Sequence, residues 1–241
     1  MTAAQRAAPR RERVRAATIE EIKQTALRLM NEQGTLNVRF TDIARAMEMT
    51  PPALYRYFAD YDALISALIT DAYDALGDFV GQRRDAVPAG DLAGRWLAVA
   101  QAYREWARRE PQQFTLVLGM PMPGYAAPED GPTTEAAKRA MAQLAALFVE
   151  GSRLECLSPP LVHDVSVAVA ECAVTKSAEM GVRIPPEHFQ AMLHAWASLH
   201  GFVMLEIHGH FDWIGEEARD GLFFGQVQQI AHAAGMPVPE R

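Results

Sequence analysis

The stretch from Thr41 to Phe58 constrains the fold most, because it contains two short segments with helical spacing separated by a tight turn. In the first segment, Ile43 and Met47 lie four residues apart and therefore share one helix face. In the second segment, Leu54 and Phe58 repeat the same apolar spacing. Two short helices, each apolar on one side and joined in this way, predict a helix-turn-helix.

The second segment also has a helix start and a distinctive outer face. Thr50 is a good N-cap, and Pro51 suits the first helical position, where the N–H has no intrahelical partner. We expect Leu54 and Phe58 to face inward. The remaining residues offer phenolic hydroxyls and one guanidinium, but no carboxylate that would repel phosphate: Pro52, Ala53, Tyr55, Arg56 and Tyr57. This face predicts a recognition helix that binds double-stranded DNA.

Specific roles follow for the residues of this face. We expect Arg56 to reach a base edge or a phosphate, and Tyr55 and Tyr57 to position the domain by hydrogen bonds to phosphates. Packing of the Tyr57 ring against the first helix is the alternative, because Tyr57 stands three residues after Leu54. The residues expected to contact DNA are Thr41, Arg45, Thr50, Pro52, Ala53, Tyr55, Arg56 and Tyr57.

The residues from about 17 to 66 resemble the TetR family of bacterial one-component transcriptional regulators. The DNA-binding helix of that family ends in Leu-Tyr-x-His/Tyr-Phe, and this chain has Leu-Tyr-Arg-Tyr-Phe at residues 54–58. Two positions depart from the family pattern: Glu48 stands at a turn position often held by Gly, and Tyr61 replaces the Lys that usually opens the fourth helix and meets a phosphate. The resemblance implies a ligand-responsive homodimer, most often a repressor, that binds a palindromic operator.

Length, composition and charge fit this interpretation. The chain has 241 residues, of which 49% are apolar and 22% charged, as in ordinary globular proteins of one or two domains. Residues 1–60 carry 10 Lys+Arg against 7 Asp+Glu, or +3, so the net charge of −7 leaves −10 for residues 61–241. A basic head on an acidic remainder favours nucleic-acid binding at the head. No apolar run approaches the roughly 20 residues that a bilayer requires, and no signal sequence opens the chain, so we expect a cytoplasmic protein without a membrane span.

The helical pattern predicts an all-α architecture, since no run shows sustained two-residue alternation. Residues 1–16 are rich in Arg and look like a flexible basic arm, which either lies along DNA phosphates or is a solvated tail. Thr18 and Glu21 fit a capping box that starts the first helix, and Gly34 ends it. We expect a three-helix helix-turn-helix domain at residues 17–61 and a larger helical effector-binding and dimerisation domain at 62–241. Its helices are expected at residues 62–85, 92–109, 111–118, 134–150, 160–180, 186–208 and 216–234.

Large rings and adaptable thioethers in this second domain predict an effector pocket for a mostly apolar small molecule. Tyr103 and Tyr125 would supply polar groups that orient the ligand, and the Pro-rich stretch from Gly119 to Thr133 would gate entry. Ordinary core packing is the alternative for each residue. The expected lining is Trp96, Tyr103, Trp106, Phe114, Met120, Met122, Tyr125, Met141, Leu144 and Phe148.

The last two helices predict a dimer interface, because their apolar residues cover more than one face and one chain would not easily bury them all. Simple core packing is the alternative for Trp196. The residues expected at the interface are Trp196, Phe202, Val203, Phe223, Val227 and Ile230.

Other chemistry finds little support in the sequence. Cys156 and Cys172 lack a metal-ligand or redox spacing, and His208 and His210 flank a single Gly near a helix end, so we expect no metal site and no cofactor. There is no Gly-x-Ser-x-Gly elbow, Gly-rich phosphate loop or His-Glu-x-x-His motif, so we expect no enzyme. Two alternatives stay open: a regulator of this fold controlled by a partner protein instead of a small molecule, and a helical enzyme with a DNA-binding head.

Overall fold

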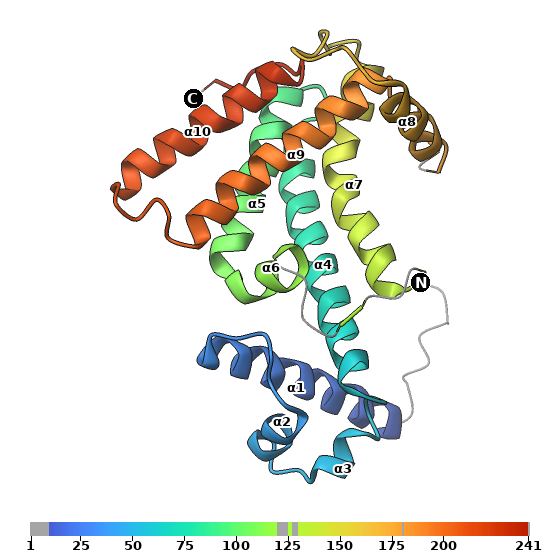
Figure 1. Ribbon diagram of the computed structural model, residues 1–241, viewed down its shortest axis with the longest axis vertical. Coiled ribbons are helices and arrows are strands. Elements are labelled where there is room, and N and C mark those ends of the chain that lie inside the picture. The colour runs from blue at the N-terminus through green and yellow to red at the C-terminus, as the bar shows by residue number, and fades with distance from the viewer. Residues whose placement is uncertain (1–9, 120–124, 127–129, 180, 241) are drawn as a thin grey trace. The chain divides into compact units, whose positions relative to one another are not determined.

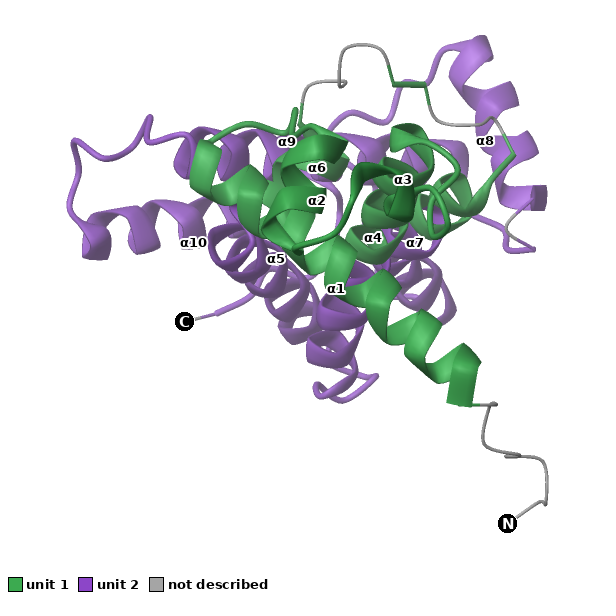
Figure 2. Ribbon diagram, turned by 90° about the horizontal axis from the view of Figure 1, so that it is seen from below, with its two compact units in different colours: residues 1–73, 112–137 green, residues 74–111, 138–241 purple. Residues whose placement is uncertain are grey.

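The computed structural model describes residues 10–119, 125–126, 130–179 and 181–240. These residues form ten α-helices and no strand, which confirms the predicted all-α fold (Figure 1). The chain divides into two compact units (Figure 2). We call residues 1–73 with 112–137 the head, and residues 74–111 with 138–241 the body.

The head places two very short helices on a longer one. Gly34 adopts a φ of +62°, a left-handed conformation that ends the first helix where predicted. The third helix has four residues, too few to be stable alone, so it depends on tertiary packing. The helices of the head are α1 (Arg10–Gln33), α2 (Phe40–Ala46), α3 (Pro51–Leu54), the first part of α4 (Tyr61–Asp85) and α6 (Pro111–Leu118).

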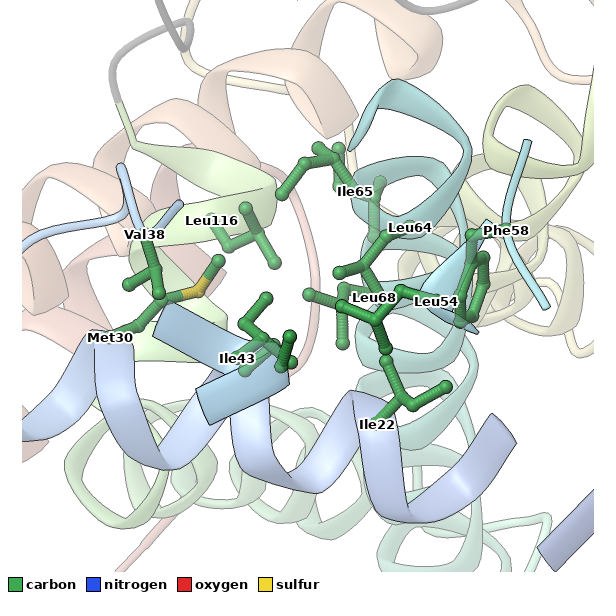
Figure 3. Close-up of a cluster of buried hydrophobic side chains, with 13 residues drawn as sticks. Ile22, Met30, Val38, Ile43, Leu54, Phe58, Leu64, Ile65, Leu68 and Leu116 are labelled. Carbon is green, nitrogen blue, oxygen red and sulfur yellow. The ribbon is translucent and has the colours of Figure 1, made fainter. Parts of the chain in front are cut away.

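An apolar cluster supplies that packing (Figure 3). Ile22 of α1, Ile43 of α2 and Leu54 of α3 are completely buried within it. The inward orientation predicted for Leu54 and Phe58 is confirmed, since Phe58 is 7% exposed. Each large aliphatic side chain buried in this way contributes about 1.5–3 kcal/mol, so the cluster holds α2 and α3 in place against α1.

The start of α1 differs from the prediction. Thr18 lies inside the helix, where its hydroxyl donates to the Val14 carbonyl at 3.0 Å, so it is not an N-cap. The helix begins at Arg10, because the run of Arg and Ala before Thr18 consists of good helix formers. The expectation of a flexible arm is therefore wrong for residues 10–16, and residues 1–9 lie outside the described residues.

The body consists of longer helices that pack around α9. α9 packs against α5, α8 and α10, and α10 also packs against α5. On another side, a Cβ added at Gly77 would lie 3.2 Å from the Ala140 Cα, so this glycine permits α4 and α7 to approach closely. The helices of the body are the second part of α4, α5 (Leu92–Arg109), α7 (Pro132–Arg153), α8 (Val167–Glu179), α9 (Pro186–Ile207) and α10 (Glu216–Ala233).

The helix predicted from Pro160 begins later, at Val167. The Ser158 N–H donates to the Gly235 carbonyl at 2.8 Å, and the Leu161 N–H donates to the Ala233 carbonyl at 2.9 Å. Residues 158–161 therefore pair with the end of α10 instead of forming a helix. The adjacent prolines, which lack N–H groups, favour this extended course.

A buried charged network ties three helices of the body together. Arg104 of α5 donates to both carboxylate oxygens of Glu206 on α9, at 2.7 and 2.5 Å. Arg104 also pairs with Asp220 of α10 at 2.8 Å, and its guanidinium lies 4.5 Å from the centre of the Phe223 ring. This geometry satisfies the buried charges and sets the register of α5, α9 and α10.

Candidate nucleic-acid interface and ligand cavity

The turn between α2 and α3 has the geometry of a helix-turn-helix. Glu48, at the position where the resemblance leads one to expect Gly, adopts a φ of +53°. The Met49 N–H then donates to the Ala44 carbonyl at 2.9 Å, which closes the end of α2. Thr50 occupies the N-cap position of α3 with Pro51 following, as predicted, although the Thr50 side chain makes no capping hydrogen bond.

The residues expected to contact DNA lie on α2, at the N-cap of α3, on α3 and on the turn after α3. α2 and α3 pack against each other. None of them is buried. Ala53 and Tyr57 are partly exposed, and the exposed ones are Thr41, Arg45, Thr50, Pro52, Tyr55 and Arg56. Six of the eight side chains are therefore free to contact a ligand at the surface of the head.

The two tyrosines differ in their surroundings. The Tyr55 ring is 56% exposed and meets the Phe40 ring edge-on, with centroids 5.3 Å apart. The Tyr57 ring packs against the apolar cluster of the head, which is the alternative that the sequence left open. Tyr55 is thus the more accessible phenol for a DNA contact.

Arg15 holds the end of the recognition turn and was not predicted to do so. Its Nη2 donates to the Arg56 carbonyl at 3.3 Å, and its guanidinium lies 5.5 Å from the centre of the Tyr57 ring. A cation over an aromatic face is stabilised by the ring quadrupole. The contact joins residues 41 positions apart, and no local pattern in the sequence indicates it.

Two exposed arginines flank one carboxylate on α2. Arg39 and Arg45 are each 80% exposed at the side chain, and they pair with Asp42 at 3.2 and 3.3 Å. Exposed pairs of this kind contribute only about 0–1 kcal/mol, so phosphates can compete for both guanidiniums. Arg45 was among the predicted residues. Arg39 was missed, although its place directly before the helix was a usable signal.

Tyr61, which stands where the family pattern has a Lys, contacts other residues of the head. Its hydroxyl donates to the Leu36 carbonyl at 3.2 Å, and its ring meets the Phe40 ring edge-on at 5.9 Å. Burial raises the pKa of the Tyr61 phenol, so the hydroxyl keeps the proton that it donates. The side chain stabilises the entry to α2.

Three of the residues predicted to line an effector pocket meet at one cavity of the body: Tyr103, Met141 and Leu144. The cavity has a volume of about 30 Å³ and lies among α4, α5, α7 and α9. Its other lining residues are Leu76, Val80, Val99, Ala140, Gln143, Trp196 and Leu199.

Of the other predicted lining residues, those that the structure describes do not line this cavity, and the ten-residue pocket stays a prediction. Trp96 is fully buried, and its indole donates to the Val227 carbonyl at 2.9 Å. Trp106 and Phe148 are buried elsewhere in the body. Two others belong to the head: Phe114 is buried there, and the Tyr125 hydroxyl pairs with the Ser66 hydroxyl at 2.9 Å. Met120 and Met122 lie outside the described residues.

Polar groups stand at one side of the cavity. The Tyr103 hydroxyl lies 2.9 Å from His200 Nδ1, and the His200 ring stacks on the Trp196 ring with centroids 5.7 Å apart. Two buried atoms of the lining have no hydrogen-bond partner: Trp196 Nε1 and Gln143 Oε1. An unpaired donor and an unpaired acceptor beside one cavity require an explanation, because buried polar groups are usually satisfied.

A larger open groove of about 830 Å³ runs between α5 and α10. Its cations are engaged by carboxylates: Arg104 by Glu206 and Asp220, and Arg108 by Glu216 at 3.0 Å. The charges of this groove stabilise the helix pairing, which favours the smaller cavity as a ligand site.

The predicted dimer interface needs correction. One chain buries most of it, since the exposed fractions are 8% for Phe202, 0% for Val203, 3% for Phe223, 0% for Val227 and 4% for Ile230. These side chains are buried within one chain because α5, α9 and α10 all pack against one another. Trp196 lines the cavity instead. The outer faces carry a different set: Leu193, Ala197, Gly201 and Leu205 on α9, and Leu222 and Gly225 on α10.

Within the described ranges, no group of three or more His, Cys, Asp or Glu side chains is arranged to hold a metal ion. Likewise, no helix in the described part of the chain combines the length and apolar character needed to span a bilayer.

Family models match both parts of the chain. Residues 22–68 match the model of bacterial regulatory proteins of the tetR family, and residues 96–230 match the model of the tetracyclin repressor-like C-terminal domain. A solved structure described as the putative regulatory protein SCO4313 aligns with a TM-score of 0.73 and 31% identity, over 92% of this chain and 98% of that one. A protein of unknown function from Rhodococcus sp. RHA1 shares the fold, with a TM-score of 0.64 at 17% identity over 88% of this chain and 94% of that one.

Curated relatives come from mycobacteria. The HTH-type transcriptional regulator Rv1816 of Mycobacterium tuberculosis is 36% identical over 110 residues, which are 46% of this chain and 47% of the relative. The uncharacterized HTH-type transcriptional regulator Rv0681 of the same organism is 25% identical over 217 residues, which are 90% of this chain and 80% of that protein. The match to Rv1816 thus spans about half the length of that relative.

Proposed function

This chain belongs to the TetR family of bacterial regulatory proteins, and from that membership we propose that it is a homodimeric transcriptional repressor that a mostly apolar small molecule releases from a palindromic operator. The observation that carries the proposal is the outer surface of α3 and the turn after it. Pro52, Tyr55 and Arg56 are exposed there, and the surface from Pro51 to Tyr57 contains no carboxylate. Such a surface suits the major groove and its flanking phosphates.

Arg15, Arg39 and Arg45 support DNA binding from outside the recognition turn. Arg39 and Arg45 supply exposed guanidiniums beside α2, where phosphate oxygens can replace Asp42. Arg15 holds the Arg56 backbone, and so fixes where the Arg56 side chain starts. Phosphate contacts would then position the head while Arg56 reads a base edge or a further phosphate.

A mobility-shift assay with the DNA upstream of the gene tests this proposal. We expect a specific shift that weakens with salt, as phosphate contacts require. Tyr55→Phe should reduce DNA affinity without lowering the melting temperature, whereas Tyr57→Phe should do the reverse if its hydroxyl serves packing. No specific complex with upstream DNA or with DNA selected from a random pool would refute the proposed function.

Dimerisation would use the exposed faces of α9 and α10. Leu193, Ala197, Gly201 and Leu205 recur every four residues along α9, and their small and aliphatic side chains permit close helix approach. A two-fold dimer would place two heads in successive major grooves, about 34–36 Å apart or at a wider spacing.

The dimer is tested by sedimentation. Ala197→Glu should give folded monomers that lose specific DNA binding. Val227→Glu is the informative contrast: Val227 is completely buried within one chain, so this variant should unfold the body instead of producing monomers. A wild-type monomer at micromolar concentration would contradict the dimer.

Effector response would act through α4, whose residues serve both units. Leu64 and Leu68 belong to the head core, while Leu76 and Val80 line the cavity of the body. A ligand that moves the cavity wall would therefore act on a helix that also forms part of the head. A tenfold loss of operator affinity requires only about 1.4 kcal/mol of differential binding.

A further inference from the structure

Two residues that line the cavity of the body each carry a buried polar atom without a partner, one a donor and the other an acceptor. Trp196 Nε1 and Gln143 Oε1 are both buried without a partner, and both residues line the cavity. An indole N–H can only donate a hydrogen bond, and an amide oxygen can only accept one. A molecule that satisfies both must therefore carry an acceptor and a donor of its own.

The orientation of the Gln143 amide follows from its other contact. Gln143 Nε2 donates to the Arg139 carbonyl at 3.2 Å. Because this contact requires a donor, it identifies the nitrogen of the amide, and the other terminal atom is the oxygen. Gly81 makes room for that oxygen, because a Cβ at this position would lie 2.9 Å from Gln143 Oε1. The acceptor thus lies next to Gly81 of α4, and the amide is oriented by its contact within α7.

The donor, the indole N–H of Trp196, belongs to a ring that also contacts its neighbours. The Trp196 ring stacks on the His200 ring with an interplanar angle of 17°, and His200 Nδ1 lies 2.9 Å from the Tyr103 hydroxyl. These contacts constrain the plane of the indole. Both orphan atoms thus belong to side chains that contact neighbouring groups of the body.

The rest of the lining limits the charge and the size of a ligand. It contains Leu76, Val80, Val99, Leu144 and Leu199, and no Lys, Arg, Asp or Glu. A ligand carboxylate or ammonium would be buried there without a partner charge, which is strongly unfavourable. The volume of about 30 Å³ holds roughly two waters, so a larger ligand must displace side chains. Met141 is partly exposed and conformationally adaptable, so it is the side chain most readily displaced.

We propose that this cavity binds a small, uncharged, mainly apolar molecule with an amide-like pair of groups, an acceptor for the Trp196 indole N–H and a donor for the Gln143 carbonyl. The proposal rests on the proposed function, because it names the class of effector for that regulator. The binding geometry itself concerns the body alone.

A matched ligand series tests the proposal by calorimetry on the full chain. Benzamide carries both groups, acetophenone replaces the amide NH₂ by a methyl and keeps the acceptor, ethylbenzene has neither group, and benzoate is charged. We expect benzamide to bind about tenfold more tightly than acetophenone, acetophenone about tenfold more tightly than ethylbenzene, and benzoate not at all. Met141→Ala, which enlarges the cavity, should strengthen benzamide binding.

Two variants assign each preference to one atom. Gln143→Met should abolish the preference for benzamide over acetophenone, and Trp196→Phe should abolish the preference for acetophenone over ethylbenzene. Gln101→Met is the control, since Gln101 is an exposed residue of α5 outside the cavity. If Trp196→Phe fails to fold, Gln143→Met and the wild-type series still decide.

Several results would overturn the proposal: no benzamide binding to either the wild type or Met141→Ala, equal affinities across the series, or preferences that survive Gln143→Met. A different result would refute the proposed function while leaving the binding site intact. Benzamide that binds with the predicted preferences but leaves operator affinity unchanged would uphold the site and refute its role as the effector site.

Discussion

The head and the body differ in where their charged groups lie, although both units bury uncharged polar residues, such as Thr25 in the head and Ser177 in the body. The core cluster of the head is entirely apolar, and the polar residues around α2 and α3 lie on its surface. The body buries Arg104 and Glu206, the two charged residues that are buried among those the structure describes. It also contains a cavity with unpaired polar atoms.

This difference has different consequences for the head and for the body. The apolar core maintains the fold of the head, and the surface residues are available to bind DNA. These surface residues can therefore change without loss of the fold. The body buries the Arg104–Glu206 pair, so its stability depends on that pairing. All four Trp residues, 96, 106, 196 and 213, belong to the body, so tryptophan fluorescence reports the unfolding of the body alone.

The largest expected effect tests the charged network of the body. Glu206→Ala leaves the Arg104 guanidinium with the more exposed Asp220 as a partner, and should lower the free energy of unfolding by about 3–5 kcal/mol. Urea denaturation followed by tryptophan fluorescence measures it. The double variant Arg104→Met with Glu206→Leu removes the charges together and should cost far less. Equal losses in the single and double variants would show that the loss does not come from leaving the Arg104 guanidinium without its buried partner.

The head should respond to the loss of an apolar group instead. Leu54→Ala removes a completely buried side chain and should cost the head about 2–5 kcal/mol. Faster amide hydrogen exchange in α2 and α3, with an unchanged fluorescence transition, is the expected signature. Val14→Ala is the matched control because Val14 is 59% exposed, and it should change stability by less than about 0.5 kcal/mol. A simultaneous loss of the body transition would contradict the separation of the two units.

The sequence predicted the head better than the body for a physical reason. Ile43, Leu54 and Phe58 were identified from spacing because short helices meet their core partners through local periodicity. The body depends on contacts such as Arg104 with Glu206, which lie 102 residues apart and leave no local pattern. Likewise, the apolar faces of Val203 and Val227 indicated burial but could not show whether the cover comes from the same chain or from a partner. At the cavity, Tyr103, Met141 and Leu144 were found by residue type, whereas the orphan atoms of Trp196 and Gln143 require coordinates.

The surface function of the head is tested by Arg56→Ala. We expect a loss of about 1–3 kcal/mol in operator affinity and a relaxed preference at one base pair per half-site if Arg56 reads guanine. If it contacts phosphate, affinity should fall evenly across sequences and the salt dependence should decrease. Arg28→Ala is the control, since Arg28 is exposed on α1 and pairs with Glu32. Unchanged operator affinity in Arg56→Ala would refute both roles.

The smallest expected change in stability concerns one backbone position in each unit. Glu48 in the head and Glu155 in the body both adopt a φ of +53°, and both are exposed. A side chain in this left-handed conformation costs about 1–2 kcal/mol, whereas Gly avoids that cost but loses about 0.5–1 kcal/mol of chain entropy on folding. Each Glu→Gly variant should therefore be more stable than the corresponding Glu→Ala variant by up to about 1 kcal/mol, since both remove the carboxylate and only Ala keeps the Cβ. The gain from Glu155→Gly should appear in the fluorescence transition, and the gain from Glu48→Gly in the hydrogen exchange of α2 and α3. If Gly and Ala are equivalent at Glu48 but not at Glu155, the turn of the head relaxes to accommodate a side chain, and the geometry of its recognition surface is set by the apolar core beneath it rather than by the turn.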